Sequence, residues 1–219
     1  MTLAARAAEN QQQEGGGARK AILQAARQRF LHYGYKKTTI DEIAQDAGVG
    51  KGTVYLHFSG KDAILLTLVL EVKRAINAQV RAIAATPALT PEERLRRMIR
   101  TGIECVHDAY TGMPHGSELV DDLRLHLQDQ PHFQEQFARE SEIGRDALVG
   151  VLREGVASGV FGPFDDDEQT AHLLQAAFTS FYPPYRCPAY PKARTRAELE
   201  AGADALLDLL LCGLRRRAA

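Results

Sequence analysis

A cation and several hydroxyl groups lie close together in the stretch Val49–Phe58, which reads VGKGTVYLHF. Lys51 carries a positive charge, and the hydroxyl groups of Thr53 and Tyr55 can donate to phosphate oxygens or to the edges of bases. A glycine stands on each side of the lysine, so the backbone can approach a partner closely. These residue types suit contact with a phosphate backbone, provided that one element holds them on an exposed face.

Hydrophobic spacing predicts that element. Val54 and Phe58 are four residues apart, so they share one side of a short helix and can be buried together. Burial of these two residues would also compensate for the low helix propensity of the glycines around them. The polar side chains left off the buried face are those of Lys51, Thr53, Tyr55 and His57.

A second short helix is predicted just before this stretch. Thr39 and Glu42 have the spacing of a capping box, in which each side chain accepts from the other residue's backbone N–H. An apolar stripe follows at helical spacing until Gly48, which is expected to end the helix. Two short helices joined by a tight turn with glycine form a helix-turn-helix, whose second helix enters the major groove of DNA.

Ordinary packing is the alternative reading of one short glycine-rich helix. Charge favours the DNA-binding reading, because residues 1–62 carry 9 Lys and Arg against 6 Asp and Glu. The rest of the chain carries 18 against 22, so a net charge of +3 adjoins one of −4. Such an asymmetry predicts a polyanionic partner for the N-terminal part. The basic residues close to the two helices are Arg19, Lys20, Lys36, Lys37 and Lys61.

Residues 19–66, and above all TTIDEIAQDAGVGKGTVYLHFSGKDAIL, resemble the DNA-binding domain of the TetR family of transcriptional regulators. The resemblance implies that Thr38 and Thr39 contact the phosphate backbone. It also implies that Lys51, Gly52 and Thr53 face bases or nearby phosphates. Further phosphate contacts are implied for Tyr55, His57 and Lys61. No role follows for Leu56.

The remainder of the chain is also predicted to be helical. Capping boxes begin helices at Thr90 and Thr195, and a run of acidic residues at 165–168 begins another. Further helices are expected after the turn at Ser59–Lys61, around 117–128 and over 132–158. We therefore expect an all-α fold with a disordered N-terminal tail (1–17), a helix-turn-helix domain (18–62) and a larger helical effector-binding and dimerisation domain (63–219).

The family resemblance also implies roles for this larger domain. Its last two helices are expected to form a four-helix bundle with a second subunit, and the helices before them to enclose a pocket for a small effector. Leucines of the last two helices can equally face the chain's own core. The interface candidates are Leu173, Phe178, Leu206 and Leu210. The pocket candidates, which suggest a hydrophobic effector, are Tyr110, Met113, Leu123, Phe137, Phe178 and Tyr182.

Other classes of protein find little support in the sequence. Cys105, Cys187 and Cys212 are far apart and match no disulfide framework. No apolar run is long enough to span a bilayer, and the N-terminus lacks the apolar core of a signal peptide, so a cytoplasmic protein with no membrane partner is expected. We see no catalytic set, no metal site and no cofactor motif.

The sequence thus predicts a homodimeric, ligand-responsive regulator, a repressor that leaves a palindromic operator in double-stranded DNA when a small effector binds. One alternative is a helical small-molecule enzyme with an accessory DNA-binding head. The other is an architectural DNA binder without an effector. A convergent set of acid, base or metal-binding residues would favour the enzyme. The large helical domain over 63–219 argues against the architectural protein, because binding DNA alone does not need so many residues.

Overall fold

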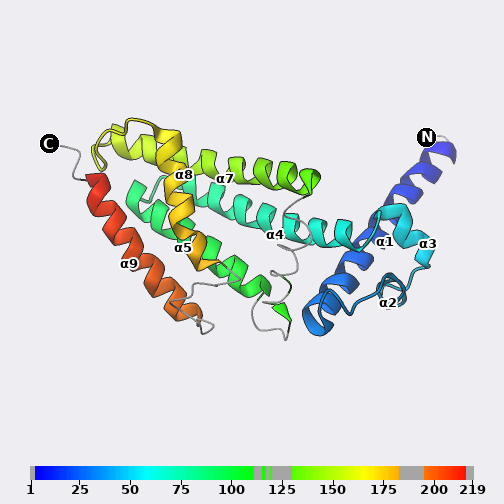
Figure 1. Cartoon of the computed structure of the whole chain (residues 1–219). Helices are drawn as coiled ribbons and strands as arrows, with labels where there is room; N and C mark the ends of the chain where they lie inside the picture. The colour runs from blue at the N-terminus through cyan, green and yellow to red at the C-terminus, as the bar shows by residue number, and fades with distance from the viewer. Residues whose placement is uncertain (1–2, 111–114, 117–118, 120–129, 183–194, 216–219) are drawn as a thin grey trace. The chain divides into compact units, whose positions relative to one another are not determined.

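The computed structural model describes residues 3–110, 115–116, 119, 130–182 and 195–215 (Figure 1). Within these residues the chain is helical and contains no strand, which confirms the all-α prediction. The elements are α1 (Leu3–Tyr33), α2 (Ile40–Asp46), α3 (Lys51–His57), α4 (Lys61–Ala84), α5 (Pro91–Tyr110), α7 (Pro131–Ala157), α8 (Asp167–Phe178), the 3₁₀ turn η1 (Thr179–Phe181) and α9 (Arg196–Arg215).

The chain divides into two compact units. Unit 1 comprises Met1–Val69 and Tyr110–Phe133, and unit 2 comprises Leu70–Ala109 and Gln134–Ala219. Unit 1 therefore contains a later segment of the chain besides the predicted helix-turn-helix region, and the domain boundary after residue 62 stays a prediction. None of the described helices is both long enough and apolar enough to cross a membrane.

In unit 1, α1 supplies the apolar surface on which the two short helices pack. Ile22, Ala26 and Phe30 lie on one side of α1 and are fully buried. Gly34 has a φ of 87°, a left-handed conformation that glycine adopts without strain, and α1 ends just before it. At its other end α1 begins at Leu3, which differs from the disordered tail expected for residues 1–17; the alanines, glutamines and glutamates there have high helix propensity.

The expected capping box of α2 is confirmed. The Thr39 hydroxyl oxygen accepts from the Glu42 backbone N–H at 3.3 Å, and a Glu42 carboxylate oxygen accepts from the Thr39 N–H at 2.8 Å. Gly48, with a φ of 66°, lies in the turn after the helix. The sequence signals thus define both ends of the seven-residue α2.

Unit 2 is built around an apolar core to which α5, α7, α8 and α9 contribute. The fully or almost fully buried members include Leu95, Leu152, Ala171, Leu199 and Leu207. Capping boxes begin α5 at Thr90 with Glu93 and α9 at Thr195 with Glu198, as predicted. The helix expected around 117–128 lies almost entirely outside the described residues.

Ion pairs hold the helices of unit 2 together at the edge of this core. Arg94 of α5 is almost completely buried and makes a bidentate pair with Glu154 of α7, at 2.5 and 2.8 Å. On another side of α5, Arg96 reaches Asp204 at 3.2 Å and Asp208 at 2.5 Å on α9. Two carboxylates of α9 thus form ion pairs with α5. Hydrophobic periodicity in the sequence does not predict these pairs.

Candidate nucleic-acid interface

The helix α3 is held in place by the two residues that the sequence predicts to be buried. Val54 is 0% exposed and Phe58, the residue after the helix, is 5% exposed. The Gly50 carbonyl oxygen accepts from the backbone N–H groups of Thr53 and Val54, at 2.9 and 3.3 Å, and closes the first turn. Burial thus fixes a short helix whose own propensity is low.

The opposite face of α3 is open. Tyr55 is 52% exposed and the Lys51 side chain is also 52% exposed, while Thr53 and His57 are half-buried. A Cβ built at Gly52 would meet no atom within 4 Å, so internal packing does not require glycine there. The cation and hydroxyl groups named from the sequence therefore surround a backbone position that nothing in the chain covers.

Lys51 forms an ion pair with a residue of the preceding helix. Its ammonium nitrogen donates to a carboxylate oxygen of Asp41 at 2.8 Å, and this hydrogen bond, followed by the charge of Asp41, raises the pKa of Lys51. Both side chains are more than half exposed, so water screens the pair and it contributes little to stability. A phosphate can therefore replace Asp41 as the partner of Lys51 at small cost.

The two threonines before α2 differ in whether their hydroxyl groups can reach a partner in solvent. Thr39 is exposed at the N-terminus of the helix, where its hydroxyl group donates a hydrogen bond of 2.9 Å to the Glu42 carboxylate. Thr38 is 1% exposed, and its hydroxyl donates to the Gly34 carbonyl oxygen at 2.8 Å. This is a correction to the implied role of Thr38, because its hydroxyl group ties the loop to the end of α1 and is turned away from solvent.

Lys61, the first residue of α4, makes several contacts within the chain. Its ammonium nitrogen donates to the carbonyl oxygens of Tyr35 and Thr38, at 2.8 and 2.9 Å, and lies 4.2 Å from the centre of the Tyr35 ring. Lys61 thus fastens the loop between α1 and α2 to the start of α4. Its charge remains beside the loop, where it adds to the net positive charge of residues 1–62.

Sequence reasoning missed Arg29, which joins α1 to α2. Its guanidinium pairs with Asp46 at 2.5 Å and with Glu42 at 3.0 Å. The hydrogen bond from Arg29 holds the pKa of Asp46 below its ordinary value, while hydrogen bonds from Thr39 contribute most to lowering the pKa of Glu42. Separations of 13 and 17 residues in sequence belong to no helical repeat, so no local pattern indicates these pairs.

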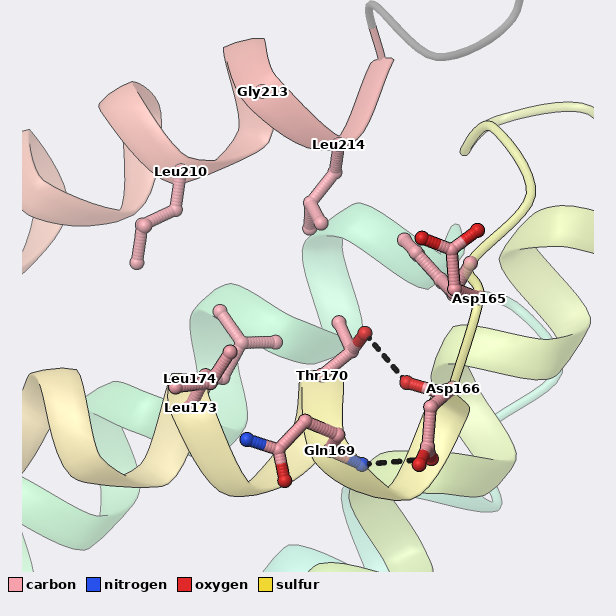
Figure 2. Close-up of a pocket in the computed structure, with 10 residues that line it drawn as sticks. Asp165, Asp166, Gln169, Thr170, Leu173, Leu174, Leu210, Gly213 and Leu214 are labelled. Atoms are coloured by element: carbon pink, nitrogen blue, oxygen red, sulfur yellow. Dashed lines mark hydrogen bonds between the residues drawn. The ribbon is translucent and has the colours of Figure 1, made fainter.

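A different kind of surface lies in unit 2, where the start of α8 faces the end of α9 (Figure 2). The groove between them has a volume of about 410 Å³. Leu173, which is 58% exposed, and Leu210 lie on opposite walls. Asp166 closes one end by capping α8, since its carboxylate accepts from the Gln169 N–H at 3.0 Å (Figure 2). The full lining is Phe164, Asp165, Asp166, Gln169, Thr170, Leu173, Leu174, Leu210, Gly213 and Leu214.

The structure separates the four interface candidates. Leu173 and Leu210 line the groove, and Leu206 is partly buried against the core of unit 2. Phe178 is 3% exposed and belongs to that core, so its assignment to an intersubunit surface was wrong. Its aromatic ring falls on the inner side of α8, which the sequence spacing did not distinguish from the outer side.

The effector-pocket candidates do not gather in one described cavity. Tyr110 belongs to unit 1, whereas Phe137, Phe178 and Tyr182 belong to unit 2. Tyr182 packs against α5, where a Cβ at Gly102 would come within 2.4 Å of its hydroxyl oxygen. Burial raises the pKa of both Tyr110 and Tyr182 to about 12. Met113 and Leu123 lie outside the described residues, and the pocket stays a prediction.

Comparison with known proteins agrees with this arrangement. Residues 22–68 match the model of the bacterial regulatory proteins, tetR family. The HTH-type transcriptional repressor KstR2 of Mycolicibacterium smegmatis is 29% identical over 66% of this chain and 68% of its own. The uncharacterized HTH-type transcriptional regulator YhgD of Bacillus subtilis is 39% identical over 37% of this chain and 42% of its own.

A solved structure shares the fold over almost the whole chain. The crystal structure of a TetR-family transcriptional regulator from Mesorhizobium loti is 22% identical, covers 90% of this chain and 96% of its own, and has a TM-score of 0.71. The matched segment contains α2, α3 and all the residues of the exposed α3 face. These relatives are named as transcriptional regulators, and residues 22–68 of this chain match the tetR family of bacterial regulatory proteins.

Proposed function

We propose that this regulator is a cytoplasmic repressor that binds a palindromic operator as a homodimer and leaves it when a small apolar effector binds. The observation that carries the proposal is the open face of α3. There Lys51 and Tyr55 are exposed on the same helix as Gly52, where a Cβ would meet no atom within 4 Å. A cation, a hydroxyl group and an uncovered backbone together suit a phosphate-lined groove.

Each exposed residue has a role in this proposal. Lys51, Gly52 and Thr53 face bases or the phosphates beside them, with Lys51 exchanging Asp41 for DNA. The other contacts are to phosphates on either side of α3, because their groups lie before or after the helix or at its end. These outer contacts are assigned to Thr39, Tyr55, His57 and Lys61. Thr38 is left out, since its hydroxyl is buried.

A homodimer follows from the small size of α3. One helix of seven residues reaches too few base pairs to specify a site in a genome, whereas two helices related by a two-fold axis read a palindrome. The groove between α8 and α9 supports this step, because its walls expose leucine next to partly buried leucines. A second copy of the same surface would bury these side chains.

The effector completes the proposal. A ligand that binds unit 2 more tightly in one arrangement of the dimer shifts the population away from the DNA-binding arrangement. Coupling of this kind is typically worth about 1–3 kcal/mol, or about 5- to 150-fold in operator affinity. Aromatic side chains of unit 2, among them the buried Phe178 and the half-buried Tyr182, favour a largely apolar ligand.

The DNA-binding step is tested by selecting duplexes from a random 30-base-pair library with the purified protein. We expect a palindromic consensus from the wild type, with two half-sites about one helical turn apart. The variant Lys51→Ala, which alters only an exposed ion pair, should remain folded and bind the selected duplex more weakly. Failure of the wild type to enrich any sequence over the starting library would rule the proposal out.

The effector step needs a separate measurement. Apolar metabolites are screened for an increase in the melting temperature of the protein, and each one that binds is added to the complex with the selected duplex. We expect at least one of them to lower operator affinity within the range given above. Ligands that stabilise the protein and never change operator affinity would contradict the coupling.

A further inference from the structure

Leu56 is the most exposed large apolar residue of the described chain, and no role has been given to it above. It is 85% exposed, whereas the two neighbouring anchors of α3, Val54 and Phe58, are at most 5% exposed. Its side chain can make no hydrogen bond. An apolar side chain that is this exposed contributes nothing to the core.

The neighbours of Leu56 place it on the face that meets DNA. It lies four residues after Gly52, so the two share one side of α3, and it directly follows the exposed Tyr55. Helical side chains lean toward the N-terminus, so Leu56 lies over the turn where Gly52 has no side chain. A Cβ at Gly52 would meet no atom within 4 Å, so the Leu56 side chain does not cover the backbone on the side of α3 that the two residues share.

We propose that Leu56 reads the 5-methyl group of a thymine in each half-site of the operator. Thymine presents the one methyl group in the major groove, and the other base edges there offer hydrogen-bond donors and acceptors that leucine cannot use. Contact with the methyl group removes apolar surface of both partners from water. This inference rests on the proposed function, and it adds a specificity-determining residue to it.

The test compares thymine with uracil in the duplex selected by the wild-type protein. Uracil differs from thymine by the methyl group alone, so each thymine of the duplex is replaced in turn by deoxyuridine, symmetrically in both half-sites. We expect one position at which the wild type loses about fourfold in affinity per half-site, the factor for burying one methyl-sized group. Over the whole palindrome the loss is then about 15-fold.

The variant Leu56→Ala tests whether the leucine side chain and the thymine methyl group contact each other. It should fold with an unchanged melting temperature, because the leucine is exposed. It should bind the thymine duplex as weakly as the wild type binds the uracil duplex, and the same uracil substitution should cost it nothing further. Ile143→Ala, at a 39% exposed position on α7, is the matched control and should behave as the wild type.

Two results would overturn the inference. One is a wild type that is indifferent to uracil at every position. The other is a Leu56→Ala variant that loses affinity equally on thymine and uracil duplexes and keeps the wild-type sensitivity to uracil, since the leucine would then contact the sugar-phosphate backbone. Either result leaves the proposed function standing if a palindrome was selected, whereas failure of the selection itself would contradict the proposed function.

Discussion

The face of α3 and the groove between α8 and α9 both expose a leucine side chain, and they differ in what surrounds it. On α3, Leu56 stands beside Tyr55 and on the same helix as Lys51, so the apolar side chain lies among groups that are able to bind phosphates. In the groove of unit 2, Leu173 stands opposite Leu210, and acidic residues close one end. We infer from the comparison that the neighbours of an exposed leucine indicate its partner, and we propose a polyanion for the first surface and a second protein surface for the other.

The largest effect on operator affinity is expected from a charged substitution in the groove. Leu173→Glu should give a folded monomer, because the side chain is 58% exposed and contributes little to the core. The monomer should keep only weak, salt-sensitive binding to any DNA, with a loss of at least about 1000-fold on the selected palindrome. Sedimentation and binding titration measure the two quantities. Ile143→Glu on α7 is the matched control, and a dimeric Leu173→Glu protein with wild-type affinity would mean that the groove is not an interface.

A smaller effect is expected from the cation on α3. Lys51→Ala should weaken binding by about tenfold per half-site, the scale of one hydrogen bond to a charged group. The salt dependence of the affinity should also fall by about two units over the whole palindrome, because each half-site releases one fewer counterion. Tyr55→Ala should weaken binding with no change in that slope, since tyrosine is neutral there. If the slope of Lys51→Ala equals that of the wild type, Lys51 does not contact a phosphate.

Gly52→Ala should move stability and binding in opposite directions. A Cβ at this position meets nothing in the protein, and alanine is the better helix former, so the free energy of unfolding should rise by about 0.5–1 kcal/mol. Affinity for the selected palindrome should nevertheless fall, because the methyl group stands between the backbone and DNA. Gly150→Ala on α7, which also has open space, should stabilise the protein equally and leave binding alone. Unchanged binding by Gly52→Ala would show that the backbone does not approach DNA closely.

The smallest effect at neutral pH is expected from one tyrosine in each unit, because the difference appears only in alkali. Burial raises the pKa of Tyr110 and Tyr182 to about 12, against about 10 in an unfolded chain. Between these values the unfolded state has lost protons that the folded state keeps, so the free energy of unfolding should fall as the pH rises from about 10 to about 12. Denaturant titrations of Tyr110→Phe with Tyr182→Phe should show a shallower fall than the wild type. The exposed Tyr55→Phe is the control, and identical curves for all three proteins would contradict the burial of these phenols.

Local signals in the sequence account for much of the fold. Capping boxes at Thr39, Thr90 and Thr195 all form, because each depends on residues three positions apart. The spacing of Val54 and Phe58 likewise identifies the buried side of α3. Signals that act within one turn of helix can be read without knowing the tertiary structure.

Contacts between distant residues could not be predicted in this way. The pair of Lys51 with Asp41, ten residues away, and the pairs of Arg29 with α2 depend on how helices pack. Periodicity places Phe178 on an apolar side of α8, but it does not separate the side facing the core from the side facing the groove. The inward hydroxyl of Thr38 has the same origin, since a threonine in a loop shows its direction only in the folded chain.

The central claim is that two copies of the open α3 face bind one palindrome. Sedimentation of the wild-type protein at micromolar concentration, alone and with one equivalent of the selected duplex, tests it most directly. We expect a dimer of the 24.1 kDa chain in the absence of DNA and a complex of two chains with one duplex in its presence. A protein that stays monomeric and still binds the palindrome tightly as a single chain would contradict the claim.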